Sequence, residues 1–193
     1  MRDDEKIRSF FAIELPEDIR RYIERDIVSR LKKVPAKVKW VARENMHLTV
    51  RFLGEISRQK VDEIVEKMFD MNIQERISVV SLSLSEIGTF GRRNPRVIWL
   101  GLSGEVEKIV ELHSYIERVC DAVKLPADDK KFSPHITIGR VKSPSHTDKL
   151  LAEIKKLTIK QLDFMVKEVI LFKSTLTPSG PIYSVIEKFP FRN

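Results

Sequence analysis

The sequence predicts an α+β fold of antiparallel sheets with flanking helices. Strand-like runs are mixed with amphipathic helical stretches, without the regular strand–helix alternation of a parallel sheet and without a glycine-rich phosphate loop. The length of 193 residues suits one domain or two small lobes. A His-x-Thr strand pattern occurs twice, from His47 and from His135. We therefore expect a single domain over residues 1–193, made of two pseudo-symmetric lobes around a central cleft.

Apolar spacing and capping residues predict the helices. Pro16 is tolerated in a first helical turn, and apolar residues then recur on one helical face as far as Leu31. Ser57 is a suitable N-cap for a second helix. A third apolar stripe runs from about residue 104 to 123, and a short helix is expected over 147–156.

Runs of β-branched and aromatic residues predict the strands. The predicted strands cover residues 7–13, 38–41, 46–53, 77–84, 96–102, 135–140, 162–172 and 183–189. The turn-rich stretch TPSGP joins the last two of them.

The composition limits the classes of protein to consider. The formal net charge of +7 favours a polyanionic partner such as nucleic acid, although surplus surface lysine explains the charge equally well. Cys120 is the one cysteine, so no internal disulfide can form and a reducing setting fits best. The chain starts without an apolar signal core and has no stretch as long as a membrane span. We expect a soluble, cytoplasmic protein, and nothing demands more than a monomer.

The two His-x-Thr strands are the most informative feature of the sequence. Side chains alternate between the two faces of a strand, so His47, Thr49 and Arg51 are expected on one face and the interleaved apolar residues on the other. His135 and Thr137 share a face in the same way. One copy alone is easily explained as a strand with a polar face. Two copies together predict a shared site.

The residue types in this pattern suit phosphoryl chemistry. Histidine exchanges protons near neutral pH, so one imidazole could accept a proton from an attacking water while another donates one to a leaving oxygen. The threonine hydroxyls could donate hydrogen bonds to phosphoryl oxygens. A metal site would need further ligands, but Cys120 is alone and neither HExxH nor CxxC is present. We therefore predict neither a metal nor a cofactor.

Beyond these patterns, the sequence resembles a known family along essentially its whole length. The stretches RSFFAIELPEDI, HLTVRFLGEI, RVIWLGL, FSPHITIGRV and STLTPSGPIYSVIEKFPF are similar to the RNA 2',3'-cyclic phosphodiesterase, or 2'-5' RNA ligase, branch of the 2H phosphoesterase superfamily. The two motifs by themselves would indicate only the superfamily.

The resemblance implies a fold, an activity and residue roles. It implies two α/β lobes around a cleft and metal-independent hydrolysis of RNA 2',3'-cyclic phosphate ends to 2'-phosphates, with reversible 2'-5' joining of tRNA halves in some members. The implied proton donor is His47 and the implied acceptor is His135, with Thr49 and Thr137 holding the phosphate. The partner would be RNA with a 2',3'-cyclic phosphate end.

Other residues are weaker candidates. The resemblance makes Arg51 and Arg140 candidates for substrate binding. Arg140 lies five positions after His135, so a regular strand would turn it away from the cleft unless the strand ends or bulges. Four aromatic residues could stack on a base, although each is more often found in a core: Phe10, Phe11, Phe132 and Tyr183. A basic loop with Arg92, Arg93 and Arg96 could follow an RNA backbone or be solvated.

Two other functions remain compatible with the sequence. The cleft could bind RNA ends or a nucleotide without turnover, although the sequence mark of such a module, loss of one histidine, is not present. The same chemistry could also act on another cyclic nucleotide. The remaining histidines fit ordinary positions, His113 on a helix face and His146 in an exposed turn.

Overall fold

The computed structural model describes residues 5–91, 94–128 and 131–192. Within them nine strands form one sheet in the order β7-β4-β5-β6-β3-β1-β8-β9, with β2 also paired to β6, and every pairing between these strands is antiparallel. The strands are β1 (Lys6–Glu14), β2 (Val38–Trp40), β3 (His47–Ser57), β4 (Val80–Phe90), β5 (Val97–Gly104), β6 (Ile136–Val141), β7 (Asp163–Val166), β8 (Glu168–Thr177) and β9 (Gly180–Pro190). The predicted α+β class is confirmed.

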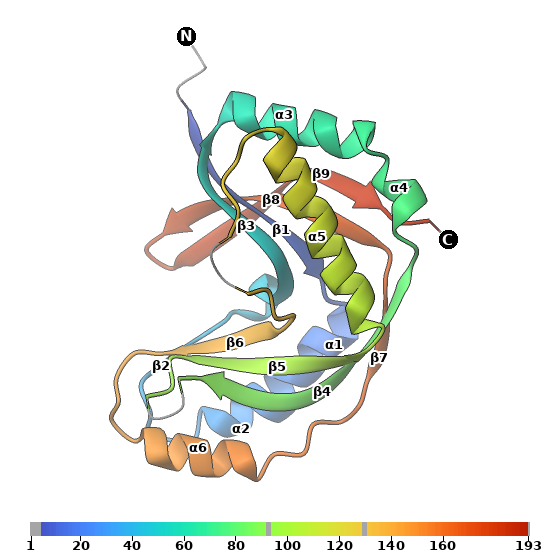
Figure 1. Cartoon of the computed structure of the whole chain (residues 1–193). Helices are drawn as coiled ribbons and strands as arrows, with labels where there is room; N and C mark the ends of the chain where they lie inside the picture. Colours follow the sequence, from blue (N-terminus) through green and yellow to red (C-terminus); the bar gives the residue numbers. More distant parts are fainter. Residues whose placement is uncertain (1–4, 92–93, 129–130, 193) are drawn as a thin grey trace.

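The sheet has two halves that meet at one point. We call β1, β3, β8 and β9 the β1 half, and β2 with β4 to β7 the β5 half. Figure 1 shows most of the β1 half above β4, β5 and β6. The halves are joined by the pairing of Leu48 in β3 with Ile136 in β6. Instead of two separate sheets, the expected lobes are thus the two ends of one curled sheet, and both His-x-Thr patterns lie at the junction.

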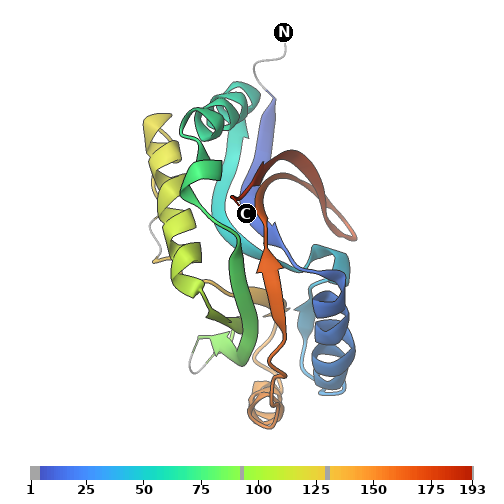
Figure 2. The same ribbon diagram turned by 90° about the vertical axis from the view of Figure 1, so that its right-hand side faces the viewer.

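Helices cover the sheet on opposite sides. The helical segments are α1 (Glu17–Tyr22), η1 (Ile23–Val28), α2 (Ser29–Leu31), η2 (Arg43–Asn45), α3 (Arg58–Asp70), α4 (Ile73–Arg76), α5 (Val106–Ala122) and α6 (Thr147–Lys155). Figure 2 shows α5 and the continuous α1–η1–α2 helix on opposite sides of the molecule. The predicted apolar stripe of that first helix is buried, since both Ile19 and Leu31 are 1% exposed.

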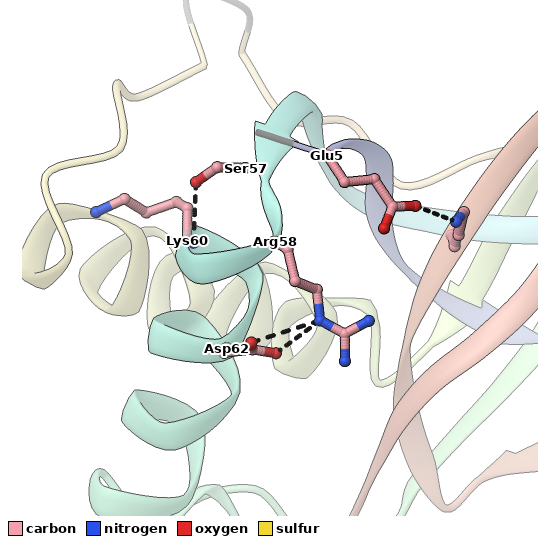
Figure 3. A network of polar contacts seen from close by, with 6 residues as sticks. Glu5, Ser57, Arg58, Lys60 and Asp62 are labelled. Carbon is pink, nitrogen blue, oxygen red and sulfur yellow. Dashed lines mark hydrogen bonds and ion pairs between the residues drawn. The ribbon is translucent and has the colours of Figure 1, made fainter. Parts of the chain in front are cut away.

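The start of α3 follows the sequence prediction. The Ser57 hydroxyl accepts a hydrogen bond from the Lys60 amide at 3.1 Å, which satisfies one of the free N–H groups of the first turn (Figure 3). On the exposed face of α3, Arg58 pairs at 3.2 Å with Asp62, which lies one turn further along the helix. α5 packs against α3 and β3, and so covers the outer side of the first His-x-Thr strand.

Two predicted strands differ from the observed ones. The run 162–172 is not one strand, because β7 ends at Val166 and β8 begins at Glu168. β7 pairs with β4 and β8 pairs with β1, so the chain passes from one half of the sheet to the other at this break. The strand expected from residue 77 begins at Val80 and continues to Phe90.

The buried residues form a main core and a small second cluster. Phe11 belongs to the main core, whereas its neighbours Phe10 and Ala12 point to the opposite face of β1. There they pack with Ile170, Phe172 and the partly buried Tyr183. This aromatic cluster adjoins His47, as the ring contacts below show. Within the described residues, no helix is both long and apolar enough to cross a membrane.

Candidate active site

His47 is held by its own strand and by the segment before it. Its Nδ1 donates a hydrogen bond to the carbonyl oxygen of Asn45 at 2.8 Å. A carbonyl only accepts, so the neutral ring must carry its proton on Nδ1. Its Nε2, 2.9 Å from the Thr49 hydroxyl, then accepts a hydrogen bond from that hydroxyl. The Nε2 of His47 is therefore a hydrogen-bond acceptor.

Aromatic rings surround the His47 imidazole. The ring centroid lies 5.1 Å from that of Phe10 and 5.3 Å from that of Tyr183. The pKa of His47 is lowered from its ordinary value of 6.5 to about 4. Burial among these groups is the main cause, the hydrogen bond to the Asn45 carbonyl opposes it, and the positive charge of Arg140 adds to the lowering. His47 is consequently neutral at pH 7 before any substrate binds.

His135 repeats one part of this arrangement. It directly precedes β6, and its Nδ1 donates to the Ser133 carbonyl at 2.7 Å. The partner is again the carbonyl two residues earlier, so the Nε2 of both histidines is the nitrogen left for chemistry. The ring packs edge-on against Phe90, with centroids 4.9 Å apart.

The strand register brings the two patterns together. Leu48 pairs with Ile136 in antiparallel fashion, and both side chains are fully buried behind the sheet. In an antiparallel pair, a step forward on one strand is a step back on the other. If this register is extended by one residue in each direction, His47 lies opposite Thr137 and Thr49 opposite His135. The two histidines are then diagonal neighbours, for which the usual spacing is roughly 7–8 Å. The register therefore brings both histidines to the junction of the two halves of the sheet.

The expected placement of Arg51 on the His47 face is wrong. Ala12 pairs with Thr49 and Phe11 with Arg51, so Val50 is an extra residue that forms a β-bulge. The bulge reverses the alternation and turns the Arg51 side chain beneath α5, where it is 6% exposed and paired with Glu117.

The side chain of Phe52 lies on the face of β3 where the side chain of Arg51 was expected. It was predicted to face the core, but its side chain is 50% exposed and its ring lies 5.9 Å from that of Phe10. A bulge cannot be read from the alternating pattern of this segment, which is unbroken.

A bulge in β6 has the opposite result for Arg140. Trp99 pairs with Thr137 and Ile98 with Gly139, so Ile138 is the extra residue. Arg140 is exposed, and its charge acts on both His47 and Tyr183. The side chain therefore reaches the cleft, which meets the condition under which the sequence made it a candidate.

A cavity of about 240 Å³ opens beside His47. Its lining combines charged, polar and apolar groups: Glu14, Arg20, Glu44, Asn45, Met46, His47, Phe172, Pro181, Ile182 and Tyr183. The sequence analysis did not select Glu14, Arg20 or Glu44. Only the pairing of Glu14 with His47 brings the end of β1 to the site, and this register is visible in the fold alone.

The other candidates are dispersed. Of the four aromatic residues considered for stacking, Phe10 and Tyr183 lie at His47, whereas Phe11 is fully buried in the main core. Phe132 stacks on His113. Arg92 and Arg93 lie outside the described residues. Across residues 5–91, 94–128 and 131–192, no group of three or more His, Cys, Asp or Glu side chains could hold a metal ion.

Comparison with known proteins identifies the family of this chain. The sequence profile of the 2'-5' RNA ligase superfamily matches residues 16–177, which include both His-x-Thr strands. The chain belongs to this superfamily. The resemblance stated from the motifs is thus confirmed.

Named relatives are similar along nearly their whole length. A protein of Methanocaldococcus jannaschii named RNA 2',3'-cyclic phosphodiesterase is 36% identical over 95% of this chain and 100% of its own length. A protein of Thermotoga maritima with the same name is 34% identical over 96% of each chain.

Solved structures of the same fold are also found. The structure of E. coli LigT complexed with 3'-AMP covers 98% of this chain and 100% of its own, with a TM-score of 0.78 and 24% identity. The structure of TT0787 of Thermus thermophilus covers 97% of this chain and 99% of its own, with a TM-score of 0.73 and 27% identity. The LigT similarity supports the fold alone.

Proposed function

We propose that this superfamily member hydrolyses RNA 2',3'-cyclic phosphate ends to 2'-phosphates by two-histidine acid–base catalysis. The observation that carries the proposal is the Leu48–Ile136 register, which aligns two His-x-Thr patterns whose Nδ1 atoms are both tied to carbonyls. The relatives named RNA 2',3'-cyclic phosphodiesterase support the choice of substrate.

The proposed reaction assigns one task to each side chain. Water attacks phosphorus as His135 Nε2 accepts its proton, and His47 Nε2 donates a proton to the leaving 3' oxygen. The bond from phosphorus to that oxygen breaks, leaving a 2'-phosphate and a 3'-hydroxyl. The hydroxyls of Thr49 and Thr137 donate hydrogen bonds to the non-bridging oxygens, which carry the growing negative charge.

His47 can serve as the proton donor only if bound substrate changes its protonation state. With a pKa of about 4, His47 is neutral in the free protein and cannot donate a proton from Nε2. An anionic phosphodiester beside the ring favours the imidazolium and raises that pKa. The Thr49 hydroxyl, released from Nε2, can then turn to the phosphate. Binding of the substrate would thus favour the protonated His47 that acts as the general acid.

Arg140 is the cation that we place on the substrate. Its charge already acts on His47, so it lies where it can share the charge of the phosphate. Arg51 is not part of this proposal, because its guanidinium is occupied by Glu117 and by two backbone carbonyls.

The same residues would support joining of RNA ends. If the 5'-hydroxyl of a second RNA takes the place of water, attack on the cyclic phosphate forms a 2'-5' linkage and frees the 3'-hydroxyl. Both histidines keep the tasks they have in hydrolysis, and they exchange them when the linkage is broken. tRNA halves with a cyclic phosphate end and a 5'-hydroxyl are the expected substrates of this reaction.

The decisive experiment measures turnover of an RNA 2',3'-cyclic phosphate in the presence of a chelator. We expect His47→Ala and His135→Ala each to lower kcat by about 10²–10⁴-fold, the usual contribution of a general acid or base. His146→Ala, in an exposed turn, is the matched control. Both site variants should unfold at denaturant concentrations close to that of the unmodified protein.

The outcome also separates the alternatives. Near-normal turnover in either site variant would refute two-histidine catalysis. Binding of the RNA end without product would favour a non-catalytic module. A panel containing a nucleoside 2',3'-cyclic phosphate and a cyclic dinucleotide would show whether another cyclic nucleotide is the better substrate.

A further inference from the structure

A buried ionic cluster lies on the far side of β3 from His47. Arg51 is 6% exposed and forms an ion pair with Glu117 of α5. It also donates hydrogen bonds to the carbonyls of Phe52 and Pro126, both at 2.6 Å, and lies 3.6 Å from an oxygen of Asp128. Burial of a guanidinium costs free energy unless the group is fully paired. The many contacts of Arg51 offset this cost, and they raise the question of what the buried arginine does.

The contacts of Arg51 converge on one segment of the chain. Pro126 and Asp128 both belong to the connection between α5 and β6, which ends at His135 and of which residues 129–130 lie outside the described part of the chain. The same connection is held a second time, because the Phe132 ring stacks on His113 of α5 with centroids 4.2 Å apart and planes 4° apart.

The end of this connection sets the orientation of His135. The Ser133 carbonyl, one residue beyond Phe132, accepts the hydrogen bond from His135 Nδ1 at 2.7 Å. His135 precedes the first residue of β6, so its backbone is not yet in the ladder that fixes Ile136. The orientation of the His135 ring therefore depends on the position of the Ser133 carbonyl. The contacts that hold the loop in place help to determine that position.

We propose that Arg51 is a positioning residue for His135. Through Pro126 and Asp128 it fastens the α5–β6 connection to β3, and so keeps Ser133 where it orients the imidazole. The inference rests on the proposed function, in which His135 accepts the proton of water. Arg51 touches no reacting atom. It lies on the same strand as His47, yet His47 is oriented independently by Asn45, Thr49 and its aromatic neighbours.

The test is a double-mutant cycle with a variant that removes the charges of Arg51 and Glu117 together and leaves the partly exposed Asp128 in place. Arg51→Met combined with Glu117→Gln removes both members of the buried pair, a change that folded proteins often tolerate. We expect kcat to fall about 10–100-fold and KM to change less than twofold, because orientation and not binding is lost. Arg51→Lys, which keeps the charge but lacks the planar fork, should recover part of kcat.

The cycle identifies the histidine through which Arg51 acts. In the His135→Ala background the double substitution should cause no further loss of kcat, whereas in the His47→Ala background it should cause its full loss. A full further loss in the His135→Ala background would overturn the proposal. If the double substitution prevents folding, Phe132→Leu loosens the same connection without removing a charge and should give the same dependence on His135.

A readout without catalysis keeps this inference separate from the proposed function. Nitrogen-15 shifts of the His135 ring report which nitrogen carries the proton. We expect Nδ1–H in the unmodified protein and a mixture of tautomers in the Arg51→Met/Glu117→Gln variant. An unchanged His135 tautomer would overturn the positioning role. Full activity of His135→Ala would instead overturn the proposed function, while the nitrogen-15 result would still stand as a test of Arg51.

Discussion

The two His-x-Thr strands carry the same residues in unlike surroundings. In both, the ring Nδ1 donates to the carbonyl two residues earlier. His47, however, sits among the rings of Phe10 and Tyr183, which remove it from water. His135 packs against Phe90, whose side chain is 40% exposed. The motif thus fixes the tautomer, and the surroundings set the protonation of His47.

The two nearby arginines show the same contrast. Arg51 and Arg140 each follow a His-x-Thr pattern, and a β-bulge lies before each. The bulge at Val50 turns Arg51 away from the cleft, while the bulge at Ile138 turns Arg140 toward it. One arginine therefore contacts the loop that precedes His135, and the charge of the other acts on His47.

The largest expected effect concerns the burial of His47 and the stability of the fold. In the unfolded chain His47 takes up a proton as the pH falls through about 6.5, but in the folded protein it does so only near pH 4. The unfolded state therefore binds more protons in this window, and the folded protein loses stability as the pH falls. Relative to His47→Gln, the unmodified protein should be about 3 kcal/mol less stable at pH 4 than at pH 7.

Denaturant unfolding of both proteins at several pH values measures this difference. Tyr183→Phe is the control, because it keeps the ring that buries His47 and should keep the pH dependence. A difference between the unmodified protein and His47→Gln that stays constant from pH 7 to pH 4 would show that His47 is not desolvated.

A smaller effect is expected at Arg140. Hydrogen bonds to charged groups contribute about 1.5–3 kcal/mol, so Arg140→Gln should raise KM for an RNA cyclic phosphate about tenfold or more. Loss of its positive charge should also raise the pKa of His47, which moves the limb of the kcat/KM profile that reports His47 to higher pH.

The pH profile of kcat/KM checks both parts of this prediction. Arg58→Gln, an exposed arginine paired with Asp62 on α3, changes the net charge equally and should leave the profile in place. If neither limb moves in Arg140→Gln, this guanidinium lies too far from His47 to act on it.

Much of the fold was predictable from local patterns. The first helix, the Ser57 cap and most strands follow from apolar spacing and capping chemistry, which act within a few residues. The prediction of a single strand over 162–172 was wrong, because the run contains neither glycine nor proline to mark the break at Lys167, where β7 ends and β8 begins in the other half. Which strands pair is decided by the whole sheet, not by the run itself.

The sequence predicts which residues carry the two motifs, but not which residues from other segments surround them. Alternation and the repeated pattern identify His47, Thr49, His135 and Thr137, and the register of Leu48 with Ile136 is compatible with all four facing one point. Alternation fails after Thr49 because the extra residue Val50 moves Arg51 and Phe52 to opposite faces, until a second register shift after Phe52 restores the pattern. The pocket residues from β1 and the partners of Arg51 come from distant segments, so no local pattern contains them.

The smallest expected effect compares the rings that flank the two histidines. Phe10 is 3% exposed and contacts four rings, those of His47, Phe52, Phe172 and Tyr183, whereas the 40% exposed Phe90 contacts Trp99 and His135. Phe→Leu keeps an apolar side chain but removes the ring contacts, so it should cost about 1–2 kcal/mol at position 10 and about 0.5 kcal/mol or less at position 90. Unfolding free energies of the two variants at pH 7 give this comparison directly. Equal costs would mean that the His47 pocket is packed no more tightly than the His135 side, and the burial invoked for the low pKa of His47 would lose its structural basis.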